Sequence, residues 1–157
     1  MSTLRWPVRL FVGAVVAAGL LAGVATFPAT GPRGDDLIVF AVLFAMATAG
    51  QLRAVHVSVK MKVTVSDTAT FAAALVLSPF LAILVAGGSS LIGLRFSWRM
   101  PLYNRLFNAA SWMLATGAAS VAYHAVAGSA PLALVHPLGI AVAAVLGYGV
   151  KALLVDV

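Results

Sequence analysis

The amino-acid sequence predicts an all-α integral membrane protein of five to six helices, and three observations point to this fold class. First, 62% of its residues are apolar and only 9% are charged, whereas soluble domains contain about 25% charged residues. Second, residues 10–32, 68–94 and 106–150 contain no Asp, Glu, Lys or Arg. Third, each run is at least as long as the roughly 20 helical residues that cross a hydrocarbon core. We therefore expect one polytopic membrane domain over residues 1–157.

The first helix is expected at residues 8–28, ending at Pro28. Arg5 and Arg9 precede its apolar stretch, and this combination is also typical of a secretory signal peptide. Because the chain that follows is itself membranous, we favour a first helix that is not cleaved.

The second helix is expected at residues 36–53, after the turn-forming stretch TGPRGDD. Asp35 or Asp36 can accept hydrogen bonds from the first N–H groups of this helix. Ser66 and Asp67 give the same type of signal for the start of the third helix.

Between the second and third helices, the stretch VHVSVKMKVTVSD, residues 55–67, alternates apolar and polar residues. This two-residue period, with many β-branched residues, is typical of an extended strand. Residues 94–100, LRFSWRM, alternate in the same way. The two segments predict either a short β ribbon or two unpaired loops at the cytoplasmic interface, with Trp98 among the interfacial aromatic residues.

Residues 67–77 and 79–94 are expected to form a helical hairpin rather than one kinked crossing, because Pro79 after Ser78 removes a backbone donor. Cytoplasmic loops carry the excess of Lys and Arg. A hairpin leaves only Arg33 on the outer side and brings nine cations to the inner side with both termini. These nine are Arg5, Arg9, Arg53, Lys60, Lys62, Arg95, Arg99, Arg105 and Lys151. A single crossing would largely remove this bias.

We expect neighbouring helices to cover the turn at Ser78 and Pro79, since irregular backbone inside a membrane needs such cover.

The last uncharged run is too long for one helix, and GSAP with His136 and Pro137 marks its turn. Helices are therefore expected at residues 103–127 and 137–155. Because the chain stops at LLVDV without a polar tail, we interpret it as the N-terminal part of a longer protein.

Several polar residues share one face at the start of the 103–127 helix. Polar groups inside membranes usually face the bundle and are functional candidates. One interpretation is a ligand cavity that faces the proline tip. The other, which we favour, is hydrogen bonding between helices with interfacial anchoring. The candidate ligand-binding residues are Ser78, Pro79, Asn104, Asn108, Ser111 and Trp112.

Small residues recur at four-residue spacing, at Gly19 and Gly23 and again at Gly139, Ala143 and Gly147. This spacing allows close helix packing where lipid gives no hydrophobic drive. GGSS at residues 87–90 predicts tight packing of the fourth helix in the same way. The pattern does not predict an oligomeric state.

No constellation of catalytic residues emerges. Tyr123, His124 and His136 could form a metal pair or a pH sensor, but no carboxylate lies nearby in the sequence, so we expect interfacial histidines and no metal. Lys151 is expected to extend toward the interface, with a buried functional lysine as the alternative. The four acidic residues lie at segment ends, so we expect no enzyme and no cofactor. The scattered cations do not indicate nucleic-acid binding.

The stretches VTVSDTATFAAALVLSPFLAILVAGGSSLIG and RMPLYNRLFNAASWMLATG, residues 63–93 and 99–117, resemble the N-terminal membrane input regions of bacterial signalling proteins. In those proteins similar helices precede an HD-type phosphohydrolase or a diguanylate cyclase domain. The same section resembles, more distantly, the S-components of energy-coupling-factor vitamin transporters, although Ser78 stands where those have glycine.

The first resemblance implies a sensory module in the bacterial inner membrane, with a cytoplasmic effector domain as its partner. The second implies a substrate-binding uptake subunit with an ATPase module as its partner. A purely structural membrane protein is the third class. Either resemblance carries over only Ser78, Pro79, Asn104 and Asn108, as residues of a central cavity.

Overall fold

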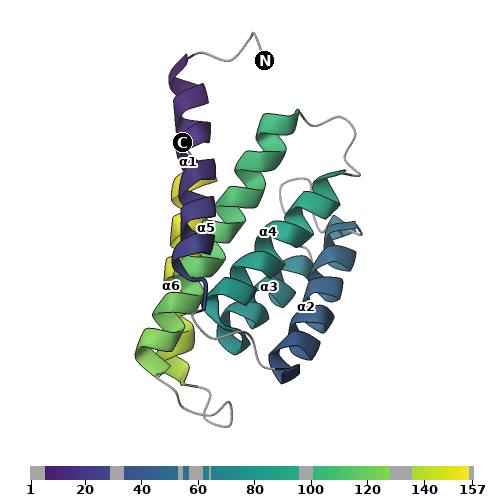
Figure 1. The fold of residues 1–157 in the computed structure, drawn as a ribbon, viewed down its shortest axis with the longest axis vertical. Coiled ribbons are helices and arrows are strands. Elements are labelled where there is room, and N and C mark those ends of the chain that lie inside the picture. Colours follow the sequence, from purple (N-terminus) through teal and green to yellow (C-terminus); the bar gives the residue numbers. More distant parts are fainter. Residues whose placement is uncertain are drawn as a thin grey trace.

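The computed structural model describes residues 6–28, 34–52, 55–56, 62–63, 65–95, 101–127 and 136–155. These residues form helices, apart from one pair of very short strands and a few turn residues (Figure 1). In chain order the elements are α1 (Trp6–Ala25), α2 (Gly34–Leu52), β1 (Val55–His56), β2 (Lys62–Val63), α3 (Val65–Val76), α4 (Pro79–Arg95), α5 (Leu102–Ala127) and α6 (Pro137–Val155).

All six expected helices are present, and the largest boundary difference is at the end of α1, expected at residue 28 and observed at Ala25. The residue before a proline is disfavoured in the helical conformation, so Pro28 ends the helix before it. Thr26 instead closes the last turn, since its Oγ1 donates a hydrogen bond of 2.8 Å to the Ala22 carbonyl.

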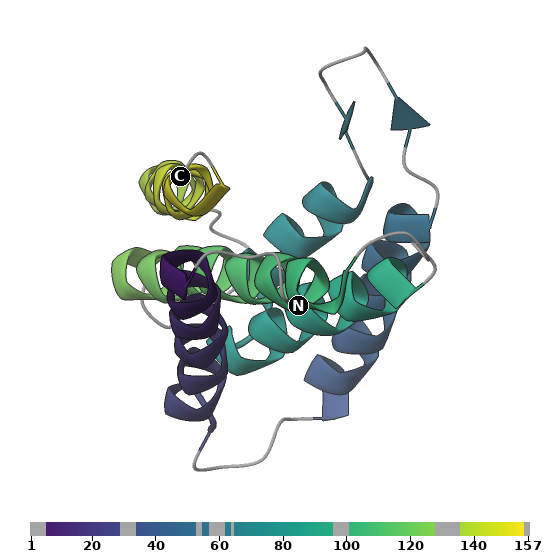
Figure 2. The same ribbon diagram turned by 90° about the horizontal axis from the view of Figure 1, so that it is seen from above.

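Helix α5 is the centre of the bundle. It packs against α6, α4, α1 and α3, while α2 packs against α3 and α4 on the far side (Figure 2). The buried residues of α5 are all small: Ala109, Ala110, Ser111, Ala115, Thr116, Gly117, Ala119 and Ser120. Small side chains allow backbones to approach closely, so α5 can pack against four helices at once.

Helices α3 and α4 form the expected hairpin, with its turn at Leu77 and Ser78. Successive helices alternate in direction (Figure 1). One end of the bundle therefore holds the start of α1, the β1–β2 pair, the connection from α4 to α5 and the end of α6. The Lys and Arg residues that the structure describes all lie in elements near that end: Arg9, Lys62, Arg95, Arg105 and Lys151. The expected positions of Arg5, Arg33, Arg53, Lys60 and Arg99 lie outside the described residues.

Within the described residues the alternating stretch pairs with itself, and the alternative of a ribbon that includes Leu94 and Arg95 is wrong. Strands β1 and β2 are antiparallel, with Val55 opposite Val63 and His56 opposite Lys62. Leu94 and Arg95 instead belong to α4, and residues 96–100 lie outside the described part of the chain. Closing a short loop costs less chain entropy than closing one of more than 30 residues, which favours the local pair.

Two expected helix caps are also placed differently. Helix α3 begins at Val65, so Ser66 lies inside its first turn, where its Oγ accepts a hydrogen bond of 2.8 Å from Gln51 Nε2. Helix α2 begins at Gly34, so Asp35 and Asp36 lie in its first turn. Carboxylates there are favoured by the positive end of the helix dipole.

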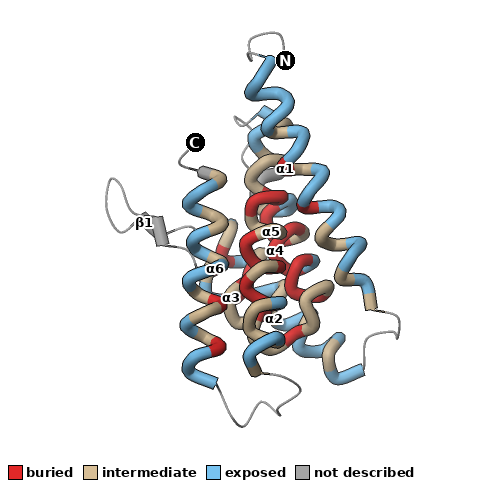
Figure 3. Tube along the Cα trace, turned by 90° about the vertical axis from the view of Figure 1, so that its left-hand side faces the viewer, coloured by how far each residue is buried: buried red, intermediate tan, exposed pale blue. Residues whose placement is uncertain are grey.

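Three helices are long and apolar enough to cross a membrane: α1, α2 and residues Pro137–Leu154 of α6. These helices also carry most of the exposed apolar side chains, whereas most of the buried residues lie in α3, α4 and α5 (Figure 3). Trp6, Val24 and Leu153 are each more than 70% exposed. Such an outward apolar surface is far more than a soluble monomer usually shows.

The glycines expected at helix contacts lie at such contacts. A Cβ added to Gly19 would lie 3.1 Å from the Ala110 Cβ and 3.2 Å from its Cα, and one added to Gly147 would lie 3.1 Å from the Ala119 Cβ. In contrast, a Cβ at Gly13 on α1 would meet nothing within 4 Å. The GLLAG pattern therefore brings α1 against α5 within the chain.

We expect Gly19→Leu to destabilise the protein by about 1–3 kcal/mol, because the larger side chain has to displace the Ala110 backbone. Gly13→Leu is the matched control on the same helix, and should be neutral or slightly stabilising because leucine is the better helix former. Thermal unfolding of both variants in detergent measures the difference. Equal melting temperatures would contradict the close contact between α1 and α5.

Candidate functional site

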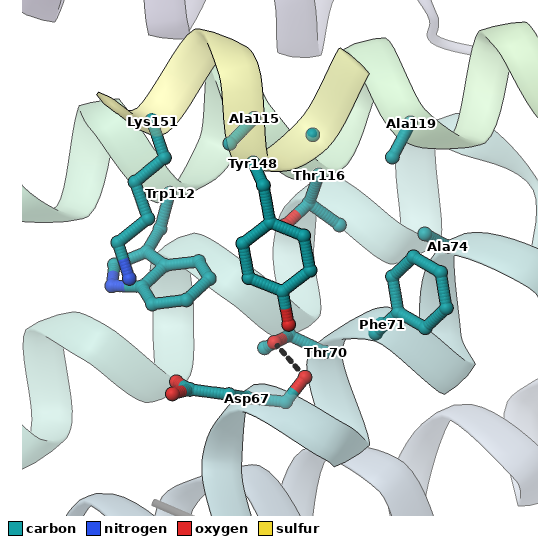
Figure 4. Close-up of a pocket in the computed structure, with 11 residues that line it drawn as sticks. Asp67, Thr70, Phe71, Ala74, Trp112, Ala115, Thr116, Ala119, Tyr148 and Lys151 are labelled. Atoms are coloured by element: carbon teal, nitrogen blue, oxygen red, sulfur yellow. Dashed lines mark hydrogen bonds between the residues drawn. The ribbon is translucent and has the colours of Figure 1, made fainter. Parts of the chain in front are cut away.

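A cleft opens between α3 and α6, and α5 forms its floor (Figure 4). It encloses about 340 Å³ of empty space, its open mouth included. The lining residues are Asp67, Thr70, Phe71 and Ala74 from α3, Trp112, Ala115, Thr116 and Ala119 from α5, and Gly147, Tyr148 and Lys151 from α6. Most of that space belongs to the open mouth, because the cavity itself measures only about 30 Å³, which is room for one or two water molecules. A larger molecule would therefore have to move the walls of the cleft apart.

Helical spacing explains how each wall is built. Residues three and four apart share one face of a helix, and the lining positions of α5 and α6 follow that spacing. Gly147 lets α6 approach the Ala119 methyl group closely. This close packing fixes the floor of the cleft and directs Tyr148 and Lys151 toward α3 (Figure 4).

The charged end of the cleft is formed by Lys151, Trp112 and Asp67. The Lys151 Nζ lies 3.2 Å from the centroid of the Trp112 ring, and its charge also interacts with the Asp67 carboxylate. A cation over an aromatic ring contributes about 0.5–2 kcal/mol, depending on its exposure to solvent. The ammonium is therefore held in the cleft by its contact with Trp112 of α5 and by attraction to the charge of Asp67 on α3.

The other end of the cleft is apolar. The rings of Phe71 and Tyr148 stack across the mouth, with centroids 6.5 Å apart and an interplanar angle of 29°. Ala74 and Ala119 belong to the same buried cluster behind them. Thr70 adds little polarity, because its hydroxyl donates to backbone carbonyls of its own helix, 2.9 Å to Ser66 and 3.0 Å to Asp67.

The turn between α3 and α4 is covered by neighbouring helices, as expected. Leu77 and Leu81 are only 1% and 4% exposed, and Ser78 and Pro79 are half-buried. The Leu77 carbonyl accepts a hydrogen bond of 3.0 Å from His124 Nε2 on α5. A carbonyl can only accept, so Nε2 carries a proton in this arrangement.

The structure does not bring the six candidate residues into one cavity. Helix α5 meets the hairpin turn at His124, which lies 16 residues beyond Asn108 and thus about 24 Å along the helix. Asn104 is exposed and Asn108 half-buried, near the opposite end of α5 from that turn. A cavity that joins these asparagines to Ser78 and Pro79 is therefore not formed, because about 24 Å or more of α5 separates them.

Ser111 and Trp112 have different roles. Ser111 is buried, but its Oγ donates a hydrogen bond of 2.8 Å to the Phe107 carbonyl within α5. Trp112 is the one candidate that lines the cleft. Sequence reasoning treated Asp67 as a cap and Lys151 as an interfacial residue, and it did not select Phe71 or Tyr148.

The two histidines that could have formed a metal pair or a pH sensor have different surroundings. His124 bonds to the Leu77 carbonyl and contacts the Tyr123 ring, with centroids 5.5 Å apart, while His136 is exposed. Within the described residues, no three His, Cys, Asp or Glu side chains are grouped closely enough to hold a metal ion.

Comparison with protein-family models, curated proteins and solved structures finds no match to this chain. The site is therefore interpreted from its own geometry.

We expect His124→Ala to destabilise the protein by about 1–3 kcal/mol, because it leaves the buried Leu77 carbonyl without this donor. For a chain of this size that is about 2–4 °C of melting temperature per kcal/mol. His136→Ala is the control, since His136 is exposed. His124→Gln keeps an N–H donor and should recover part of the loss. A melting temperature unchanged by His124→Ala would show that the hydrogen bond does not support the turn.

Proposed function

We propose that this chain is a multi-pass membrane module that senses a small molecule in the cleft between α3, α5 and α6. The observation that carries the proposal is the attachment of α6. This helix packs chiefly on α5 and meets α3 through side chains across the cleft. A molecule in the cleft would therefore change the contacts that hold α6 to α3, and α6 would transmit that change to the end of the bundle near Val155.

The membrane setting is supported by two independent features. Three helices have the length and composition of membrane spans, and their outward faces are apolar. The described cations lie in elements near one end of the bundle. By the rule that cytoplasmic loops are rich in Lys and Arg, we assign that end, with both chain termini, to the cytoplasmic side of the bacterial inner membrane.

An uptake subunit for a small molecule is the alternative function, and it would use the same cleft to hold its cargo. The two functions differ in what α6 does. A sensory module needs α6 to respond to occupancy, whereas a carrier that only presents its cargo to an ATPase partner does not. The resemblance to signalling input regions and the position of α6 as a cleft wall both favour sensing.

Cysteine labelling tests the topology, and the sequence has no native cysteine to remove. In sealed inverted vesicles, Lys62→Cys and Pro101→Cys should react with a membrane-impermeant maleimide. Gly34→Cys and His136→Cys, at the other end of the bundle, should react only after the vesicles are opened. Labelling of positions 62 and 101 from opposite sides would overturn the proposed topology.

Filling the cleft tests the proposed response of α6. Spin labels on Thr68→Cys of α3 and Leu153→Cys of α6 report the distance between the cleft walls, and neither residue lines the cleft. We expect Ala119→Trp on the floor, and more mildly Ala74→Leu on α3, to change this distance by at least about 1–2 Å, the size of typical helix shifts. Val121→Trp is the control, because Val121 lies on α5 outside the cleft and is 49% exposed.

An unchanged distance in both cleft variants would contradict sensing through α6. It would leave the cleft as a static binding site, which is compatible with the uptake function.

A further inference from the structure

We infer that the ligand of the cleft is a small molecule with an anionic head and an apolar body, and that Lys151 binds its head. This inference rests on the proposed function only in placing a ligand in this cleft. It follows from the shape of the lining, from the contacts of Lys151 and from the position of Asp67.

The lining is divided into two ends. Lys151, Trp112 and Asp67 lie together at one end, while Phe71, Ala74 and Ala119 form the other (Figure 4). A ligand that matches this division has a polar head and an apolar body. The cavity of about 30 Å³ holds only one or two water molecules as it stands, so the part of the ligand that enters is small and would have to widen the cleft.

The charge of the head follows from the contact that Lys151 can give up when a ligand binds. Its ammonium rests on the face of Trp112, and its four-carbon stem is flexible. A charge-assisted hydrogen bond to an anion is stronger than a cation–π contact at a partly exposed site. An anionic head can therefore take the ammonium from the Trp112 ring at little conformational cost.

Asp67 does not offer an equivalent site for a cationic head. It lies in the first turn of α3, where the positive end of the helix dipole already favours its negative charge, and it interacts with the Lys151 ammonium. A cationic ligand would also have to take the Trp112 face from Lys151 and then lie beside a like charge. An anionic head at Lys151 would also approach the Asp67 carboxylate, but the positive end of the α3 dipole partly offsets that charge. The geometry therefore favours an anion.

Fluorescence of Trp112 gives a direct binding test. The chain has three tryptophans, so Trp6→Phe with Trp98→Phe leaves Trp112 as the sole reporter. Three probes of equal chain length carry a quenching bromine and differ only in the head: 8-bromooctanoate, 8-bromooctanol and 8-bromooctyltrimethylammonium. The alcohol measures simple partitioning into detergent. At about pH 8 the carboxylate is ionised, because carboxyl groups titrate near pH 4.

We expect 8-bromooctanoate to reach half-quenching at a concentration about fivefold to tenfold lower than the alcohol, as a charge-assisted hydrogen bond implies, and the ammonium probe to quench no better than the alcohol. Lys151→Met should make the carboxylate and the alcohol equal. Lys151→Arg keeps the cation and should retain the preference, which separates loss of charge from loss of folding. Equal quenching by carboxylate and alcohol in the parent, or preference for the ammonium probe, would overturn the inference.

Two further arms identify the source of the anion and separate the two proposals. Lys151-dependent quenching by dibrominated phosphatidylglycerol, but not by dibrominated phosphatidylcholine, would identify a membrane lipid as the ligand, while quenching by 8-bromooctanoate alone would identify a free acid.

The spin labels at positions 68 and 153 report the position of α6 independently. If 8-bromooctanoate binds without changing their distance, sensing fails and the ligand class stands. If another probe is preferred and changes the distance, the ligand class fails and sensing stands.

Discussion

The bundle depends on which groups form hydrogen bonds with the backbone at the turn where α3 ends and α4 begins. Pro79 cannot donate a hydrogen bond, and the chain reverses there beside buried Leu77 and Leu81, with Ser78 and Pro79 half-buried. Buried backbone groups need partners, and in a membrane water cannot supply them. His124 provides one by donating to the Leu77 carbonyl, and the ring of Phe27 packs edge-on against Phe80 with centroids 5.0 Å apart. This turn therefore needs α5 and the end of α1 beside it, and so it fixes the order of helices around the centre.

Small residues make that arrangement sterically possible. Helix α4 carries Gly88 against the Phe44 ring of α2 and Gly87 against Met113 of α5, where added Cβ atoms would lie 2.7 Å from side-chain carbons. The core consequently contains few large side chains, and close backbone approach takes the place of bulky packing. The same close approach leaves room for a cleft. Because α6 lies close to α5 at Gly147, it does not also fill the space in front of α3.

The sequence allows the helices to be predicted well, because each depends on local properties. Uncharged runs mark the helices, Pro79 marks the break, and the asymmetry of Lys and Arg predicts a hairpin instead of a single crossing. The pairing of Val55–His56 with Lys62–Val63 was harder to predict, since two alternating segments were both compatible with a ribbon and only three-dimensional placement distinguishes them.

The site was predicted less well for a physical reason. Its residues come from three helices, and lining residues of different helices are 28–84 positions apart in the chain. Single-helix periodicity can find only one wall at a time. It found Trp112 on α5. Lys151 stood out as the sole cation in the last helix, but its partner Trp112 lies on another helix, and that contact depends on the crossing of α5 and α6.

The central place of α5 also affects how the protein is assembled. Helix α1 packs chiefly on α5, yet 77 positions separate Ala25 from Leu102. At typical synthesis rates α1 would emerge about 4–15 s before its main partner. In the proposed membrane setting α1 can wait as an independent span, because it is long and apolar enough to be stable there alone. The shorter α3 has no such independence, so the hairpin should complete its docking only when α5 has entered the bilayer.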